Sequence, residues 1–97
     1  MKPKLRLVQD GKSVELISFG VVSAGSSKQV IVSVFNDGDA DLVDAEFSIE
    51  STEVQIVNAP VTIKHGSNAN LTLEYHPSIN VEKGLSVMLM IKGSYVV

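Results

Sequence analysis

The chain has no cysteine and no tryptophan, and it contains only three phenylalanines and two tyrosines among 97 residues. Without cysteine, neither a disulfide framework nor a thiolate metal site can form, so stability must come from packing. The scarcity of aromatic residues predicts an aliphatic core of Val, Leu and Ile. It also argues against a carbohydrate-binding module, which displays exposed rings for stacking on sugars.

Long apolar runs are absent too. No apolar segment reaches the length that crosses a bilayer, and no signal-peptide core follows the charged start of the chain. The net charge of −3 lacks the basic footprint of a nucleic-acid-binding protein. We therefore expect neither membrane nor nucleic acid as a partner. The chain starts with Met1, and we expect a complete small gene product with one domain spanning residues 1–97.

Motifs that carry catalysis or bind cofactors are missing. The chain has no Gly-x-Ser-x-Gly, no phosphate loop and no dinucleotide glycine pattern. His65 and His76 have no third ligand at a matching spacing, and zinc needs three or four ligands. We expect no enzyme activity and no cofactor.

An acidic turn holds the most suggestive metal ligands. Its carboxylates are Asp37, Asp39, Asp41 and Asp44. A calcium loop of the EF-hand type needs glycine at its sixth position and glutamate at its twelfth, but Leu42 and Ser48 stand there. We expect a solvated turn and no metal, with a cation held by an irregular loop as the alternative.

The residues that are present alternate in polarity over short stretches. Val30, Val32 and Val34 share one face of a valine-rich stretch and are expected to point into the core. No segment shows helical spacing. The alternation and the turn signals predict an all-β fold, an immunoglobulin-like antiparallel β-sandwich of about seven strands. The expected extended segments are 4–8, 14–19, 28–36, 43–50, 54–57, 61–63, 70–76 and 85–92, with 93–97 continuing the last one or forming a short final strand.

A family resemblance rests on two stretches. Residues 19–27, the strand ending in Asn36, Gly38 and 40–42 resemble the ASPM–SPD-2–Hydin (ASH) and major-sperm-protein type of immunoglobulin-like domain. Residues 71–77 followed by Gly84 are similar to that family's late strand, proline and glycine. The family usually continues into a full final strand. Here we expect that strand to be truncated, or residues 85–97 to form one long strand that does both jobs.

The resemblance also carries the functional expectation. A free-standing domain of this size resembles the small immunoglobulin-like proteins of tailed-bacteriophage virions. It implies a non-enzymatic structural protein of the virion, in the head decoration, neck or tail, made in the host cytoplasm. The alternative is a cellular interaction module of the ASH or major-sperm-protein type that binds a peptide or protein partner.

A protein interface is expected at apolar residues that point away from the core. If the valines at 30, 32 and 34 point inward, then Ile31 and Phe35 point outward. The same logic turns Met88 and Met90 outward, and Met and aromatic residues are enriched at contacts. The alternative is that a layer or loop covers these strands on both faces.

A second element of the expected interface is the basic N-terminal strand, which contrasts with the acids of residues 37–53 and would steer partners into register. The alternative is that these charges only solvate the outer face of a sheet. The partners would be other virion proteins or copies of the chain. An exposed edge beside the C-terminal strand would accept a neighbour's strand. The complete predicted interface is Lys4, Arg6, Ile31, Phe35, Met88 and Met90.

Overall fold

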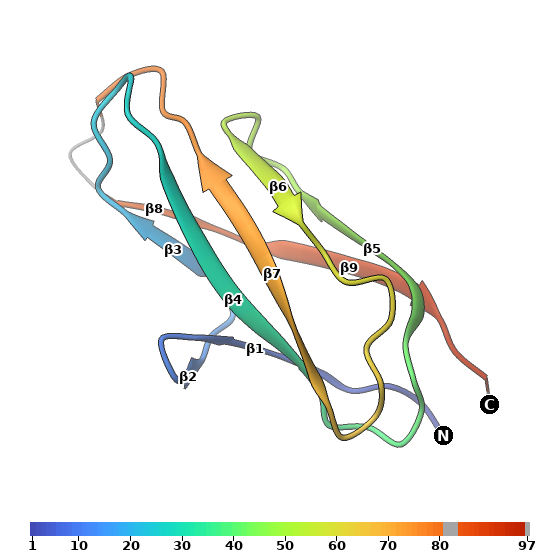
Figure 1. Ribbon diagram of the computed structural model, residues 1–97. Helices are drawn as coiled ribbons and strands as arrows, with labels where there is room; N and C mark the ends of the chain where they lie inside the picture. The colour runs from blue at the N-terminus through green and yellow to red at the C-terminus, as the bar shows by residue number, and fades with distance from the viewer. Residues whose placement is uncertain (81–83, 97) are drawn as a thin grey trace.

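The computed structural model describes residues 1–80 and 84–96, and within them it contains only strands and connecting loops (Figure 1). All strand pairs are antiparallel, and the strands form two packed layers, as expected of a β-sandwich. No helix in the described part of the chain could cross a membrane. The strands are β1 (Leu5–Gln9), β2 (Lys12–Ser13), β3 (Ile17–Gly20), β4 (Lys28–Asn36), β5 (Val43–Ile49), β6 (Val54–Asn58), β7 (Asn68–Tyr75), β8 (Leu85–Val87) and β9 (Leu89–Ser94).

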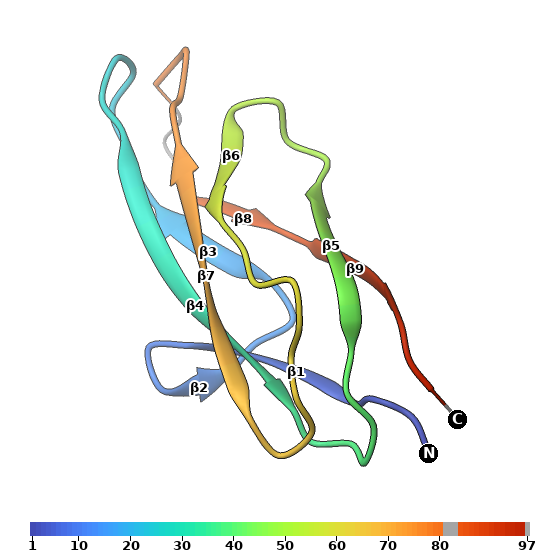
Figure 2. The same ribbon diagram turned by 45° about the vertical axis from the view of Figure 1, so that its right-hand side comes forward.

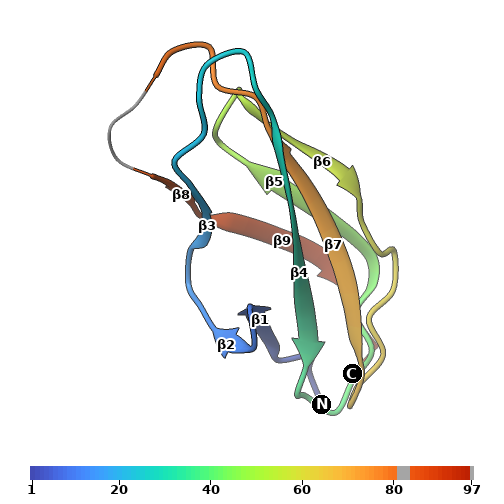
Figure 3. The same cartoon turned by 60° about the vertical axis from the view of Figure 1, so that its left-hand side comes forward.

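The first layer is a five-stranded sheet in the order β2-β1-β4-β7-β6. The second layer pairs β3 with β8 and β5 with β9, and it crosses behind β4 and β7 (Figures 1 and 3). Only Met88 separates β8 from β9, so the two run on as one line. Of the two alternatives for the end of the chain, this favours a long strand, although β9 ends at Ser94 and leaves Tyr95 and Val96 outside it. Both termini lie at the same end of the molecule (Figures 1 and 2).

The core between the layers is aliphatic around a single aromatic pair. Phe19 and Tyr75 lie with their ring centres 5.5 Å apart. Val32, Leu71 and Leu73 are fully buried beside them. The predicted inward face of β4 is confirmed, although Val30 at its start is only half-buried. A smaller cluster of Val34, Leu42 and Ile63 closes the end nearer the termini.

One expected segment is shorter than predicted. The sequence predicted an extended piece at 14–19, whereas β3 begins only at Ile17 and residues 14–16 belong to no strand. Just before this segment, residues 12–13 form β2, because Asp10 and Gly11 both have positive φ (53° and 77°). Two such residues in succession make a tight hairpin, and Lys12 consequently pairs back onto Gln9.

The expected extended segment 61–63 pairs with the start of β5. Leu42 and Ile63 exchange both backbone hydrogen bonds, and the Ala45 N–H donates to the Val61 carbonyl over 2.8 Å. Asp44, between Leu42 and Ala45 in the sequence, has a φ of 51° and lies where the register of β5 with β9 shifts. This connection ties the start of β5 to the loop that leaves β6.

Asn36 is a fully buried polar residue and joins three segments at the end of β4. Its Nδ2 donates to the carbonyls of Ala40 (2.8 Å) and Ile63 (3.0 Å). Its Oδ1 accepts from the backbone N–H groups of Lys4 and Gly38, both over 3.1 Å. A buried amide with every bond made stabilises the fold, whereas the same amide left unpaired would cost free energy.

Candidate protein interface

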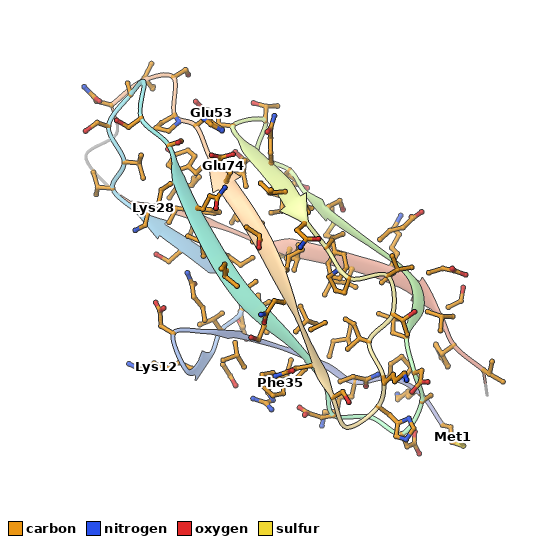
Figure 4. All side chains as sticks on the ribbon, viewed as in Figure 1. Met1, Lys12, Lys28, Phe35, Glu53 and Glu74 are labelled. Atoms are coloured by element: carbon orange, nitrogen blue, oxygen red, sulfur yellow. The ribbon has the colours of Figure 1, made fainter. Side chains whose placement is uncertain are left out.

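The outer face of the five-stranded sheet carries two of the predicted interface residues. Ile31 is 62% exposed, in agreement with an outward orientation. Phe35 also points outward but is half-buried, because the Arg6 guanidinium lies 4.5 Å from its ring centre (Figure 4 labels Phe35). Arg6 and Phe35 are direct partners in the β1–β4 register. The structure thus brings Arg6 and Phe35 together and leaves Ile31 uncovered.

The basic arm is held within its own chain. Arg6 Nε lies 2.7 Å from Asp37 Oδ2, and Arg6 Nη2 lies 3.3 Å from Asp37 Oδ1. The hydrogen bond to Arg6 lowers the pKa of the Asp37 carboxyl. The Lys2 N–H donates to Asp39, and the Lys4 N–H donates to Asn36. The acidic turn therefore binds the N-terminal residues 2–6 of the same molecule.

Met88 and Met90 lie on the outer face of the other layer. Met88 is 64% exposed and Met90 is 43% exposed. Their neighbours Val87, Leu89 and Ile91 turn toward the core. The two methionines border a groove together with Glu50 and Leu85.

The six predicted residues therefore form two groups and not one patch. Arg6, Phe35 and Ile31 lie on the outer face of the first layer, with Lys4 just before β1. Met88 and Met90 belong to the β8–β9 line of the second layer. Because the layers pack core to core, their outward side chains face opposite sides of the sandwich.

The acidic turn also holds His65. The Asp41 carboxylate accepts the His65 backbone N–H over 2.9 Å and lies 2.7 Å from His65 Nδ1. The backbone hydrogen bond, followed by the bond to the imidazole, lowers the pKa of Asp41. Within residues 1–80 and 84–96, no three His, Asp or Glu side chains gather as a metal site would require. The pair instead fastens the loop after 61–63 to the turn before β5.

One feature that sequence reasoning missed is a groove between the β1–β2 hairpin, β3 and the first half of β4. Its walls include Lys12 and Val14 on one side and Lys28 and Val30 on the other. Gly20 lies among the residues that border it. The only sequence signal at this place is the Asp10-Gly11 turn, which folds the hairpin back beside β4.

Comparisons with known proteins place the chain in no family. No family model matches it, and no curated protein or solved structure is significantly similar to it.

Proposed function

We propose that the chain is a non-enzymatic structural protein of a bacteriophage virion, a head-decoration, neck or tail component acting through protein–protein contacts. The observation that carries this proposal is the pair Met88 and Met90, which expose apolar side chains next to each other on one outer face. Exposed methionines suit a contact surface because a flexible thioether adapts to the shape of a partner. The assignment of this contact to a virion rests on the resemblance to small virion proteins.

Ile31 adds a second contact surface on the opposite side of the sandwich. A component with contact surfaces on two sides can join two neighbours, which is how repeated arrays are built from one subunit. The intramolecular bonds of Arg6 to Asp37 and Phe35 leave Ile31 as the main apolar contact on that face.

The experiment that tests this function is particle sedimentation. Virions of the phage whose genome encodes the chain are purified on a density gradient and analysed by mass spectrometry. We expect peptides of the chain in the particle band, in a simple ratio to the major head or tail protein. A chain that stays entirely in the soluble fraction at the top of the gradient contradicts the proposal.

A pair of variants then locates the contact. Replacing Met88 and Met90 by Ser should reduce the copies retained on the particle about tenfold, which corresponds to about 1.4 kcal/mol of binding free energy. Val21→Ser is the control, because Val21 is 65% exposed and lies in the loop between β3 and β4, on no strand of either layer. Equal loss in both variants would contradict an interface at the methionines.

The alternative function is a cellular interaction module that binds a peptide or protein partner. It shares the contact surfaces and differs in context: genes for head and tail proteins beside this gene favour the virion. Light scattering over a wide concentration range adds a physical test. A closed oligomer favours a self-assembling part, and a monomer throughout favours a part that binds another protein.

A further inference from the structure

Among the residues that the structure describes, the first half of β4 is paired on one side only. β7 pairs with β4 along its whole length, from Lys28 to Phe35. β1 pairs only with the second half, between Ser33 and Asn36. Residues 28–32 consequently form an open edge in the middle of the first layer, beside the upper part of β4 in Figure 1.

The hydrogen bonds at the end of β4 show which backbone groups this edge presents. The Asn36 N–H donates to Ser67 and its carbonyl accepts from Gly66, so the polar backbone of Asn36 faces the β7 side. Backbone direction alternates along an antiparallel strand. Gln29 and Ile31 therefore direct N–H and C=O away from β7, toward the open side. Within the described residues, no hydrogen bond reaches these groups from that side.

The edge is open because the Gln9 side chain, at the end of β1, is hydrogen-bonded to β3 in the other layer. Gln9 Nε2 donates to the Ser18 carbonyl over 2.7 Å, and Gln9 Oε1 accepts the Ser18 N–H over 2.9 Å. The Gln9 amide thus occupies both backbone groups of Ser18, as a neighbouring strand would. β1 leaves β4 after Val8, and the groove described above remains between them.

The groove has the chemistry of a strand-binding site. Val14 and Val30 supply apolar wall, and Gly20, which has no side chain, is among the residues that border it. Lys12 and Lys28 lie on the β2 side and the β4 side (both are labelled in Figure 4), with Asp10 as the single acid among the lining residues. Two N–H and two C=O groups, from Gln29 and Ile31, suit an added strand of about five residues.

We propose that this groove binds an extended acidic peptide segment of a partner protein, which adds to β4 as a strand. Its backbone would pair with Gln29 and Ile31. Lys28 and Val30 share one face of β4, so an apolar side chain would pack on Val30 and an acidic side chain two residues along, on the same face of the added strand, would face Lys28. The positive walls favour an acidic occupant. A second copy is a poor fit: its acidic strand β5 already pairs with β9 and, at its start, with residues 61–63. The inference does not depend on the virion role.

The test is a nuclear magnetic resonance titration of the full chain. The probe is a pool of capped seven-residue peptides with Thr at every second position and with Glu and one of Val, Ile or Leu sharing the positions between, so that acidic and apolar side chains lie on one face. A pool with Lys in place of Glu is the control. We expect the acidic pool to shift the Gln29 and Ile31 amide signals and to slow their hydrogen exchange about tenfold. The basic pool should leave them unchanged. No shift with the acidic pool, or equal shifts with both pools, overturns the proposal.

Two substitutions at one position separate backbone pairing from side-chain contact. Ile31→Pro removes the outward N–H and leaves the β4–β7 hydrogen bonds in place, because those come from the neighbouring residues. Ile31→Thr keeps the N–H. We expect binding to weaken about tenfold or more in Ile31→Pro and to stay within about twofold in Ile31→Thr. Equal effects of both substitutions overturn pairing along the edge.

A third variant keeps the test valid if proline disturbs the fold. Lys12 is exposed, so Lys12→Glu preserves folding while reversing one charge of the groove. This substitution should lower the affinity for the acidic peptide pool by about threefold or more. Unchanged affinity overturns the acidic specificity. Self-association of the unmodified chain that Ile31→Pro abolishes would overturn the choice of a peptide over a second copy.

Discussion

Arg6 lies over the ring of Phe35, with its guanidinium carbon 4.5 Å from the ring centre, while Arg6 Nε contacts Asp37 at 2.7 Å. One arginine thus stacks on an aromatic ring and pairs with a carboxylate at the same time. Phe35 is partly shielded from solvent without being part of the core.

Phe35→Ser should leave a folded domain. The loss of half-buried ring surface and of the cation–π contact should lower the free energy of unfolding by about 1–2 kcal/mol. Phe19→Ser, in the fully buried core, should cost more than about 3 kcal/mol. Urea unfolding followed by circular dichroism measures both variants, and a cost for Phe35→Ser that matches Phe19→Ser would contradict the assignment of Phe35 to the outer face.

Asn36→Ala should be among the most destabilising polar substitutions in the chain. It leaves the buried carbonyls of Ala40 and Ile63, and the N–H groups of Lys4 and Gly38, without their side-chain partner. We expect a cost of about 3 kcal/mol or more. The control is Asn70→Ala, which removes one exposed hydrogen bond to Ser33 and should cost less than about 1 kcal/mol. Similar unfolding midpoints for the two variants would refute the role of Asn36.

The pH dependence of stability should carry a contribution from Asp41. Its pKa is lowered below the ordinary value of 3.8 by the His65 backbone N–H first and by the imidazole second. A lowered pKa in the folded state stabilises the fold above 3.8, and this contribution is lost as the pH falls through the folded-state pKa. Asp41→Asn should therefore flatten the acid side of the stability curve.

The same pair gives a sharper measurement. His65→Ala removes the imidazole and keeps the backbone N–H, so the pKa of Asp41 should remain below 3.8 in this variant. Titration of the carboxyl carbon by nuclear magnetic resonance reads this pKa directly. A value at or above 3.8 would show that the imidazole, and not the backbone, holds the carboxylate.

Truncation at the C-terminus should show a sharp boundary. Removing residues 95–97 should change the melting temperature little, because Tyr95 and Val96 lie outside β9 and are exposed. Removing residues 92–97 also deletes the pairs of Lys92 with Glu46 and of Ser94 with Val43. We expect this longer truncation to lower the midpoint by several degrees. Calorimetry that finds equal losses would place residues 95–97 in the sheet.

Alternation of polarity predicted the inward face of β4 from sequence, because this strand has one side in the core and one in water. It predicted which way Ile31 and Met90 point. It did not reveal that their strands belong to opposite layers, since alternation is a local signal and layer membership depends on long-range pairing. The groove beside β4 could not be predicted from sequence for the same reason. It depends on a Gln9 side chain that pairs with Ser18 of the other layer.

Asn36 has a kinetic consequence as well. Its partners Lys4 and Ile63 are 32 and 27 residues away, on opposite sides of it in the sequence. Such contacts require two long loops to close, so we expect them to form after the folding transition state. Asn36→Ala would then leave the folding rate almost unchanged and mainly raise the rate of unfolding. The Asn36 side chain thus sets the lifetime of each folded molecule.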